Sequence, residues 1–424
     1  MNLSPLLLLL TVLLLAIMSM RWVSDRLDQP SVLGELLLGV AIGNVGVWLG
    51  YPFFEIVMNP AAAAATPESS EAASHTATIF HALAELGAIL LLFSAGLESS
   101  VTRMKQVGGQ AMSVAAVGVI APFALAYITC IVLHEQMSIA GHLFLAATLS
   151  ATSVGITASV LKDLRVLDRR ESEVILGAAV IDDVLGLVLL AVVSRIAATA
   201  GFSIWQIAAT LGTAILFVGA VLLLGERIAA RGTSLFRKLD RSNGLFLFPL
   251  ALAFGFAWLA ESIGLAAIVG AFAAGLVLTD QMTPATTTST DDEPTTTVSH
   301  LLAPLERFLA PIFFLYVGMQ VNVSYVLDAR TLALALLFTV CAIIGKLVAG
   351  LAAGRCADRL AVGIGMVPRG EVGLVFLGVG RGLGVVSDSL FAALLVVVFA
   401  TTVITPPLLK WAFRDQRTSQ TTTP

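Results

Sequence analysis

The stretch Ile175-Leu-Gly-Ala-Ala-Val-Ile-Asp-Asp-Val-Leu-Gly186 places two adjacent aspartates in an otherwise apolar run. The apolar character extends over the whole chain of 424 residues, of which 58% are hydrophobic and only 12% are charged. Soluble globular proteins carry about 25% charged residues. So little charge cannot cover a water-facing surface of this size. The composition therefore predicts an all-α polytopic membrane protein, whose main solvent is lipid.

Thirteen segments are apolar and long enough to cross a bilayer, whose core of roughly 30 Å needs about 20 helical residues. They lie near 3–22, 31–50, 77–97, 108–133, 138–161, 172–198, 203–225, 243–260, 262–279, 303–323, 329–353, 358–382 and 386–411. The first is interpreted as a retained span, because it lacks the basic region and the small-residue cleavage site of a signal peptide. The split at Glu261 and Ser262 decides the count, since merging the two segments would leave twelve spans.

The distribution of basic residues predicts the orientation. With the N-terminus outside, nearly all Lys and Arg fall in loops that would be cytoplasmic, as the positive-inside rule requires. The external segment 51–76 has no Lys or Arg. The loop 280–300 is the exception, because it would be cytoplasmic but has none; its Thr-rich, acidic composition predicts a flexible linker. We expect a cytoplasmic C-terminus in a cell (inner) membrane.

Several classes of protein are not supported by the sequence. No basic stripe with interleaved aromatic residues is present, so no nucleic-acid partner is expected. The three cysteines, Cys130, Cys341 and Cys356, do not suggest a disulfide framework. Residues 412–424 are expected to form a short cytoplasmic tail, with no soluble regulatory or nucleotide-binding domain in this chain. No cofactor is predicted.

Asp182 and Asp183 are the sharpest feature within the predicted spans. They point about 100° apart on a helix of 3.6 residues per turn, so one can face a cavity while the other faces a partner helix. Charges at this depth cost about 2.5–3.5 kcal/mol on insertion scales and mark ion or proton paths. Burial and a neighbouring like charge favour a protonated carboxyl. Such a group can bind a proton or a hard cation, which compete for it. The competing interpretation is a carboxylate pair satisfied by hydrogen bonds.

Lys346, in Ala342-Ile-Ile-Gly-Lys-Leu347, lies near the middle of another predicted span. An ammonium group at that depth needs an anion, and one of the two aspartates is the natural candidate. A pair that breaks when the carboxylate is protonated would couple charge to conformation. The alternative is a lysine that extends its side chain to the membrane interface.

Two predicted spans carry residues that interrupt helices. In Gly365-Met-Val-Pro-Arg-Gly-Glu-Val-Gly373, Pro and Gly flank Arg369 and Glu371, which could couple transport or form a structural ion pair. Broken helices at membrane depth occur where they line a cavity. The second candidate is Thr148-Leu-Ser-Ala-Thr-Ser-Val-Gly-Ile-Thr157, where Thr152 and Ser153 could bind a cation or simply bond their own backbone.

Together these residues resemble the monovalent cation:proton antiporter superfamily, and within it the bacterial electrogenic sodium/proton antiporters of its second family. The resemblance covers nearly the whole chain and depends on the order and spacing of several segments. They are 29–39, 85–98, 151–157, the helix of the two aspartates, 311–319, Gly345-Lys346 and Pro368-Arg-Gly-Glu371.

The resemblance implies an electrogenic sodium (or lithium)/proton antiporter that works by alternating access. It implies a homodimer and inverted repeats, in which the breaks in the fifth and twelfth spans correspond. Asp183 would be the principal cation and proton site, with Asp182 as the partner of Lys346. Residues 1–411 would form one unit. Its core domain would comprise helices near 77–198 and 303–411, and its dimerisation domain helices near 1–50 and 203–279.

Three other functions compete with this interpretation. A potassium/proton antiporter or potassium efflux transporter of the same fold stays open, because one sequence does not measure the ion cavity. An intramembrane aspartyl protease needs two aspartates converging from different helices, whereas here they are adjacent. A passive channel is disfavoured, because a buried lysine facing carboxylates would trap ions.

Overall fold

The computed structural model describes most of the predicted spans. The described residues are 4–27, 31–51, 53–54, 71–98, 108–133, 137–153, 157–158, 160–161, 164–166, 169–198, 244–263, 265–278, 298–354 and 357–420, with isolated positions between 205 and 231. Within these ranges every regular element is a helix. The all-α prediction is therefore confirmed.

Eight of the described helices are long and apolar enough to cross a membrane. They are α1 (Ser4–Arg26), α2 (Ser31–Trp48), α5 (Glu71–Glu98), α7 (Gly108–Leu133), α10 (Arg170–Ala198), α14 (Val298–Met319), α16 (Ala329–Leu351) and α19 (Asp388–Gln420). The other described helices are α8 (Ile139–Ser150), α12 (Gly244–Ser262), α13 (Ala267–Leu278), α15 (Val323–Val326), α17 (Arg359–Gly365) and α18 (Glu371–Gly382).

The predicted boundaries can be compared with these helices. The split near Ser262 is confirmed, because α12 ends there and α13 begins at Ala267. The count of thirteen spans stays a prediction, since the segment 203–225 lies largely outside the described residues. Most of the predicted loop 280–300 also lies outside them, although Val298 to His300 already belong to α14.

The predicted tail at 412–424 stays a prediction, and its first part is helical, because α19 continues to Gln420. No proline or glycine between Pro407 and Pro424 stops the helix.

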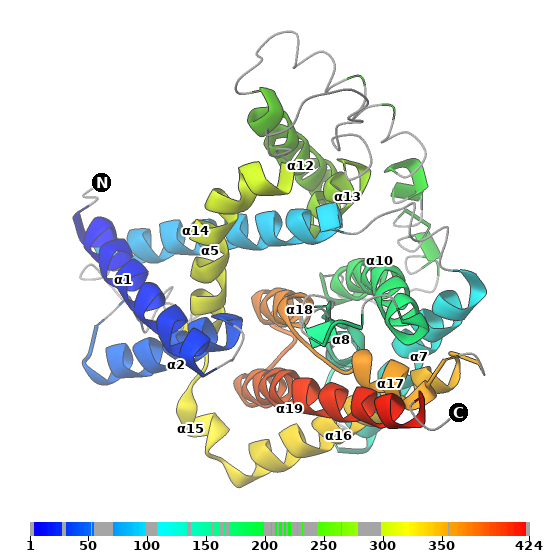
Figure 1. Ribbon diagram of the computed structural model, residues 1–424. Helices are drawn as coiled ribbons and strands as arrows, with labels where there is room; N and C mark the ends of the chain where they lie inside the picture. The colour runs from blue at the N-terminus through cyan, green and yellow to red at the C-terminus, as the bar shows by residue number, and fades with distance from the viewer. Residues whose placement is uncertain are drawn as a thin grey trace.

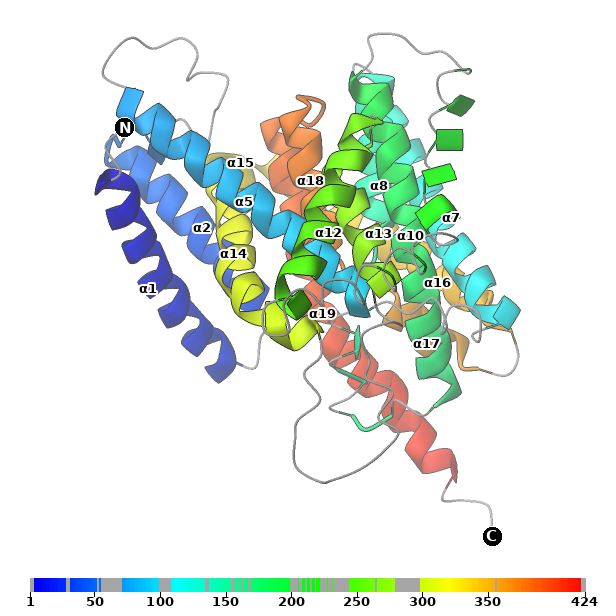
Figure 2. The ribbon, with the colours of Figure 1, turned by 90° about the horizontal axis from the view of Figure 1, so that it is seen from above.

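The helices pack into two groups, visible in two perpendicular views (Figures 1 and 2). The first, called here the scaffold group, comprises α1, α2, α5, α12, α13 and α14. The second, the core group, comprises α7, α8, α10, α16, α17, α18 and α19. The short helix α15 links α14 of the scaffold group to α16 of the core group.

This grouping can be compared with the predicted division of the chain into a core and a dimerisation domain, which stays a prediction. The spans 77–97 and 303–323 were assigned to the core domain, but α5 packs mainly against α13 and α14, and α14 against α2 and α5. Both belong to the scaffold group. The grouping used here depends on contacts between helices that are distant in the sequence.

Glycines allow close helix packing inside each group. In the scaffold group, a Cβ on Gly96 of α5 would collide with the backbone carbonyl of Phe272 in α13. In the core group, a Cβ on Gly345 of α16 would lie 2.5 Å from Cα of Pro122 in α7. Small residues that let backbones approach are a common device of membrane helices, which gain little from hydrophobic burial against lipid.

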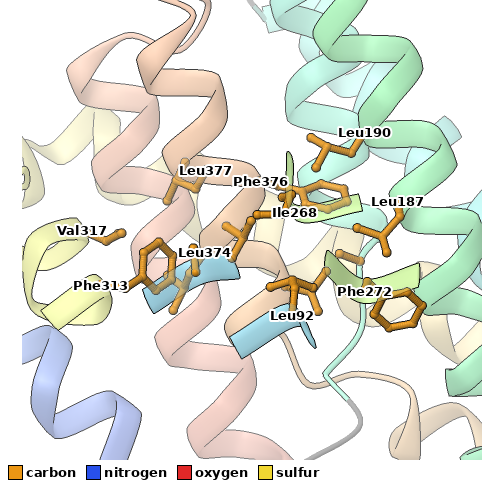
Figure 3. Close-up of a cluster of buried hydrophobic side chains, with 14 of the residues drawn as sticks. Leu92, Leu187, Leu190, Ile268, Phe272, Phe313, Val317, Leu374, Phe376 and Leu377 are labelled. Carbon is orange, nitrogen blue, oxygen red and sulfur yellow. The ribbon is translucent and has the colours of Figure 1, made fainter. Parts of the chain in front are cut away.

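The two groups meet through larger apolar side chains (Figure 3). From the scaffold group come Leu92, Ile268, Phe272, Phe313 and Val317; from the core group come Leu187, Leu190, Leu374, Phe376 and Leu377. All ten are buried. The contact between the groups therefore depends on side chains, whereas glycine contacts bring backbones together inside each group.

Candidate functional site

The core group contains two interrupted helical spans, as predicted. In the first, α8 ends at Ser150 and residues 151–153 are not helical; helix is present again at Thr157. In the second, α17 ends at Gly365 and α18 begins at Glu371. We call residues 151–153 the first break and residues 366–370 the second break.

The two breaks contact each other through their backbones and side chains. The amide of Ser153 donates a hydrogen bond to the carbonyl of Pro368, at 2.9 Å. The hydroxyl of Thr157 donates to the carbonyl of Gly365, at 2.7 Å, where α17 ends. These bonds satisfy backbone groups that have no partner inside their own helix. The broken spans are therefore joined where they cross.

Arg369 supplies the reverse connection, from the second break to the end of α8. Its Nη1 donates to the carbonyl of Ser150, at 3.1 Å, and to that of Ala151. Its own carbonyl accepts from the hydroxyl of Thr402 in α19, at 2.6 Å. A positive charge at a helix C-terminus is electrostatically favourable, because the carbonyl dipoles point there. Arg369 thus holds the end of α8, a contact that sequence analysis missed.

Asp182 and Lys346 form a buried ion pair between α10 and α16. The distance from Nζ to Oδ1 is 3.1 Å, and the side chains are 1% and 0% exposed. The predicted pairing of these two residues is therefore present. Gly118 of α7 faces the pair, since a Cβ there would lie 3.4 Å from Nζ and 3.7 Å from Oδ1. Nothing in the sequence marked Gly118, because its place depends on how α7 packs.

The remaining predicted cation ligands lie buried in the same group. Asp183 is 7% exposed, Thr152 is 2% exposed and Ser153 is fully buried. Oγ1 of Thr152 and Oδ2 of Asp182 have no hydrogen-bond partner among the described residues. An unpartnered buried oxygen is costly. Two such acceptors in one helix group suit the binding of a cation or a proton.

The predicted ion pair of Arg369 with Glu371 falls partly outside the described structure, since the Glu371 side chain is not among the described residues. A charge that sequence analysis overlooked is Glu306 in α14. Its Oε2 accepts a hydrogen bond from the Ser94 hydroxyl of α5, at 2.7 Å. Its position within the predicted span 303–323 was a signal that could have revealed it.

Comparison with known proteins defines the class. The family model described as sodium/hydrogen exchanger, transmembrane, matches residues 10–414. The chain therefore belongs to this family of cation/proton antiporters.

Among its relatives, the high-affinity Na(+)/H(+) antiporter NhaS3 of Synechocystis is 35% identical, over 92% of this chain and 86% of that protein. The Na(+)/H(+)-K(+) antiporter GerN of Bacillus cereus is 31% identical, over 92% of both chains. The solved structure of the sodium proton antiporter MjNhaP1 from Methanocaldococcus jannaschii shares the fold, with a TM-score of 0.67 at 16% identity. That match covers 97% of this chain and 98% of the other.

Proposed function

We propose that this protein exchanges sodium or lithium ions for protons across a membrane, by alternating access and with net movement of charge. The observation that carries the proposal is the buried group of Asp182, Asp183 and Lys346 beside two joined, broken spans. The relatives named as sodium/proton antiporters support the choice of ions.

Asp183 is the proposed site at which the proton and the cation compete. Its carboxylate is buried at membrane depth, where an ion is held by few, fixed groups. The Thr152 hydroxyl has no partner among the described residues, so it is a proposed ligand of the cation. Ser153 is a second proposed ligand from the same break. Because one carboxylate does not hold both ions at once, binding of one releases the other.

Asp182 and Lys346 have a separate proposed role. Their ion pair places a second titratable carboxylate next to Asp183, so that protonation at either can accompany cation release. Two carboxylates and one lysine allow more protons than sodium ions to move in each cycle, which underlies the proposed electrogenic exchange. We propose that the core group carries these residues as it moves against the apolar contact with the scaffold group (Figure 3).

Proton flux in proteoliposomes tests the proposal. Sodium and lithium added to vesicles with an imposed proton gradient should dissipate it, and protein-free liposomes should not respond. An imposed membrane potential should change the rate, because electrogenic exchange moves net charge. If no cation moves protons, the proposal fails; if the potential has no effect, exchange is electroneutral.

Potassium/proton exchange is the second candidate function. It is favoured by one observation, that GerN is named a Na(+)/H(+)-K(+) antiporter and is similar over 92% of this chain. The same assay distinguishes the two functions. If potassium alone dissipated the proton gradient, the proposed site would be kept and the transported cation would be potassium.

Orientation and assembly are also proposed. We place the protein in the cell (inner) membrane as a homodimer, with the N-terminus outside and the C-terminus cytoplasmic. A reporter fused after Pro424 should then read cytoplasmic, and an external reading would overturn the predicted orientation. Cross-linking in native membranes should trap a dimer, and a monomer at all cross-linker concentrations would contradict it.

A further inference from the structure

The described part of the chain uses only some of the hydrogen-bond donors of the Arg369 side chain. This side chain is 1% exposed, and among the described residues only its Nη1 has hydrogen-bond partners, the carbonyls of Ser150 and Ala151. Nε and Nη2 have no hydrogen-bond partner among the described residues. Buried donors without an acceptor are costly, so this pair of N–H groups needs an explanation.

The two unused donors form a particular shape. The hydrogens of Nε and Nη2 lie along one edge of the planar guanidinium, and this edge binds a carboxylate through two parallel hydrogen bonds. Lysine offers no such fork. The free edge of Arg369 is therefore suited to a carboxylate, while its opposite side holds the end of α8.

Asp182 is the acceptor that fits. Its Oδ1 accepts from Lys346, but its Oδ2 has no partner among the described residues, although the side chain is only 1% exposed. Asp182 lies on α10, which packs against α18, and Arg369 lies just before α18 begins. Asp182 is thus bonded to one buried cationic side chain, Lys346. A second, Arg369, has two N–H donors without a partner among the described residues.

We propose that Arg369 is the alternate counter-ion of Asp182 and receives its carboxylate through Nε and Nη2 when Lys346 moves away. A buried carboxylate with no partner is strongly unfavourable, so transfer to Arg369 keeps the charge compensated throughout the cycle. Arg369 is a positioning residue in this scheme. The inference depends on the proposed antiport only for the event that separates Lys346 from Asp182.

A cycle of variants tests this by thermal stability of the purified protein, which requires no transport. Arg369→Lys keeps the charge but removes the fork. It should lower the melting temperature more in a Lys346→Ala background than in the wild type. With Asp182→Asn present, the two effects should become additive, because the shared carboxylate is gone.

Arg381→Lys is the matched control for this cycle. Arg381 lies in the last turn of α18, at the end away from the second break, and pairs with Asp388 at 2.9 Å. Its effect should be additive with Lys346→Ala. If the double variant of Lys346 and Arg369 is not recovered folded, Lys346→Gln replaces Lys346→Ala in the same cycle.

A kinetic readout separates positioning from a purely structural role. At saturating sodium, Arg369→Lys should reduce the maximal exchange rate about tenfold more in Lys346→Ala than in the wild type, a coupling usual for groups in one network. The apparent KM for sodium should change less than about twofold, because the cation ligands are not altered.

Three results would overturn the inference. Additive effects of Arg369→Lys and Lys346→Ala would show that Arg369 only holds α8. Coupling that persists with Asp182→Asn would exclude Asp182 as the shared acceptor. If Glu371→Gln abolished the coupling instead, Glu371 and not Asp182 would be the acceptor for Nε and Nη2 of Arg369. If sodium-driven flux is absent from the wild type, the proposed function fails, while the stability cycle still decides this inference.

Discussion

The scaffold and core groups differ in how their buried charged side chains are paired. In the scaffold group, the Glu35 carboxylate accepts from Nε of Arg21 at 2.7 Å, and the Arg21 side chain is 36% exposed. Glu306 accepts from Ser94 in the same group. In the core group, Asp182 and Lys346 are at most 1% exposed, and one oxygen of Asp182 has no partner among the described residues.

This difference suits a static scaffold group and a core group that binds ions. A static framework needs each charge satisfied by its neighbours, and the Arg21–Glu35 and Ser94–Glu306 pairs meet that need. The core group retains buried donors and acceptors that its own described residues do not satisfy, on Thr152, Asp182 and Arg369. Buried polar groups without a partner are costly, and a bound ion or an ordered water can satisfy them. Four predictions test this contrast.

The largest effect is expected from Asp183→Asn, which should abolish cation-driven proton flux while the protein stays folded. The amide is of similar size but does not bind a proton or compensate a cation. Glu306→Gln in the scaffold group is the control and should keep flux close to that of the wild type. Undiminished flux in Asp183→Asn would remove this residue from the exchange site.

Lys346→Ala should lower the free energy of unfolding by about 2–3 kcal/mol. Removing one partner of a buried pair usually costs about 3–5 kcal/mol; compensation of Asp182 by Arg369 makes the loss smaller. Arg21→Ala in the scaffold group should cost about 1 kcal/mol or less, since Arg21 is partly exposed. Chemical denaturation in detergent measures both. Equal losses of unfolding free energy in the two variants would contradict the difference between the core and scaffold groups.

Gly345→Ala should destabilise the protein by about 1–2 kcal/mol, because the added methyl would lie against Pro122 of α7. It should also disturb Lys346, the next residue, and slow exchange. Gly378→Ala in α18 is the control, because a Cβ there would meet nothing within 4 Å. That change should be neutral or stabilising by up to about 1 kcal/mol. The reverse order of the two melting temperatures would contradict the packing of α7 against α16.

The smallest effect is expected from Ser94→Ala, at about 1 kcal/mol of stability with exchange unchanged. The substitution removes the hydroxyl that donates to Glu306 at 2.7 Å. Melting temperature and proton flux on the same preparation separate the two readouts. Loss of exchange with normal stability would give the Ser94–Glu306 pair a transport role and weaken the contrast.

The site was predictable where residue type alone was informative. Charge is so costly at membrane depth that Asp182, Asp183, Lys346 and Arg369 stood out in apolar runs. Proline and glycine near Arg369 likewise predicted the second break. Glu306 was missed although it obeys the same rule, and Gly118 carried no local signal.

The sequence by itself determined the class of fold, the two breaks and the charged residues of the site, because hydropathy and helix-breaking residues act locally along the chain. Only the tertiary structure decided the partners: which helices form each group, that Arg369 reaches the end of α8, and that Asp182 rather than Asp183 bonds Lys346. The resemblance implied that last pairing, but two adjacent helical residues differ by a rotation of about 100°, and only packing against α16 selects between them.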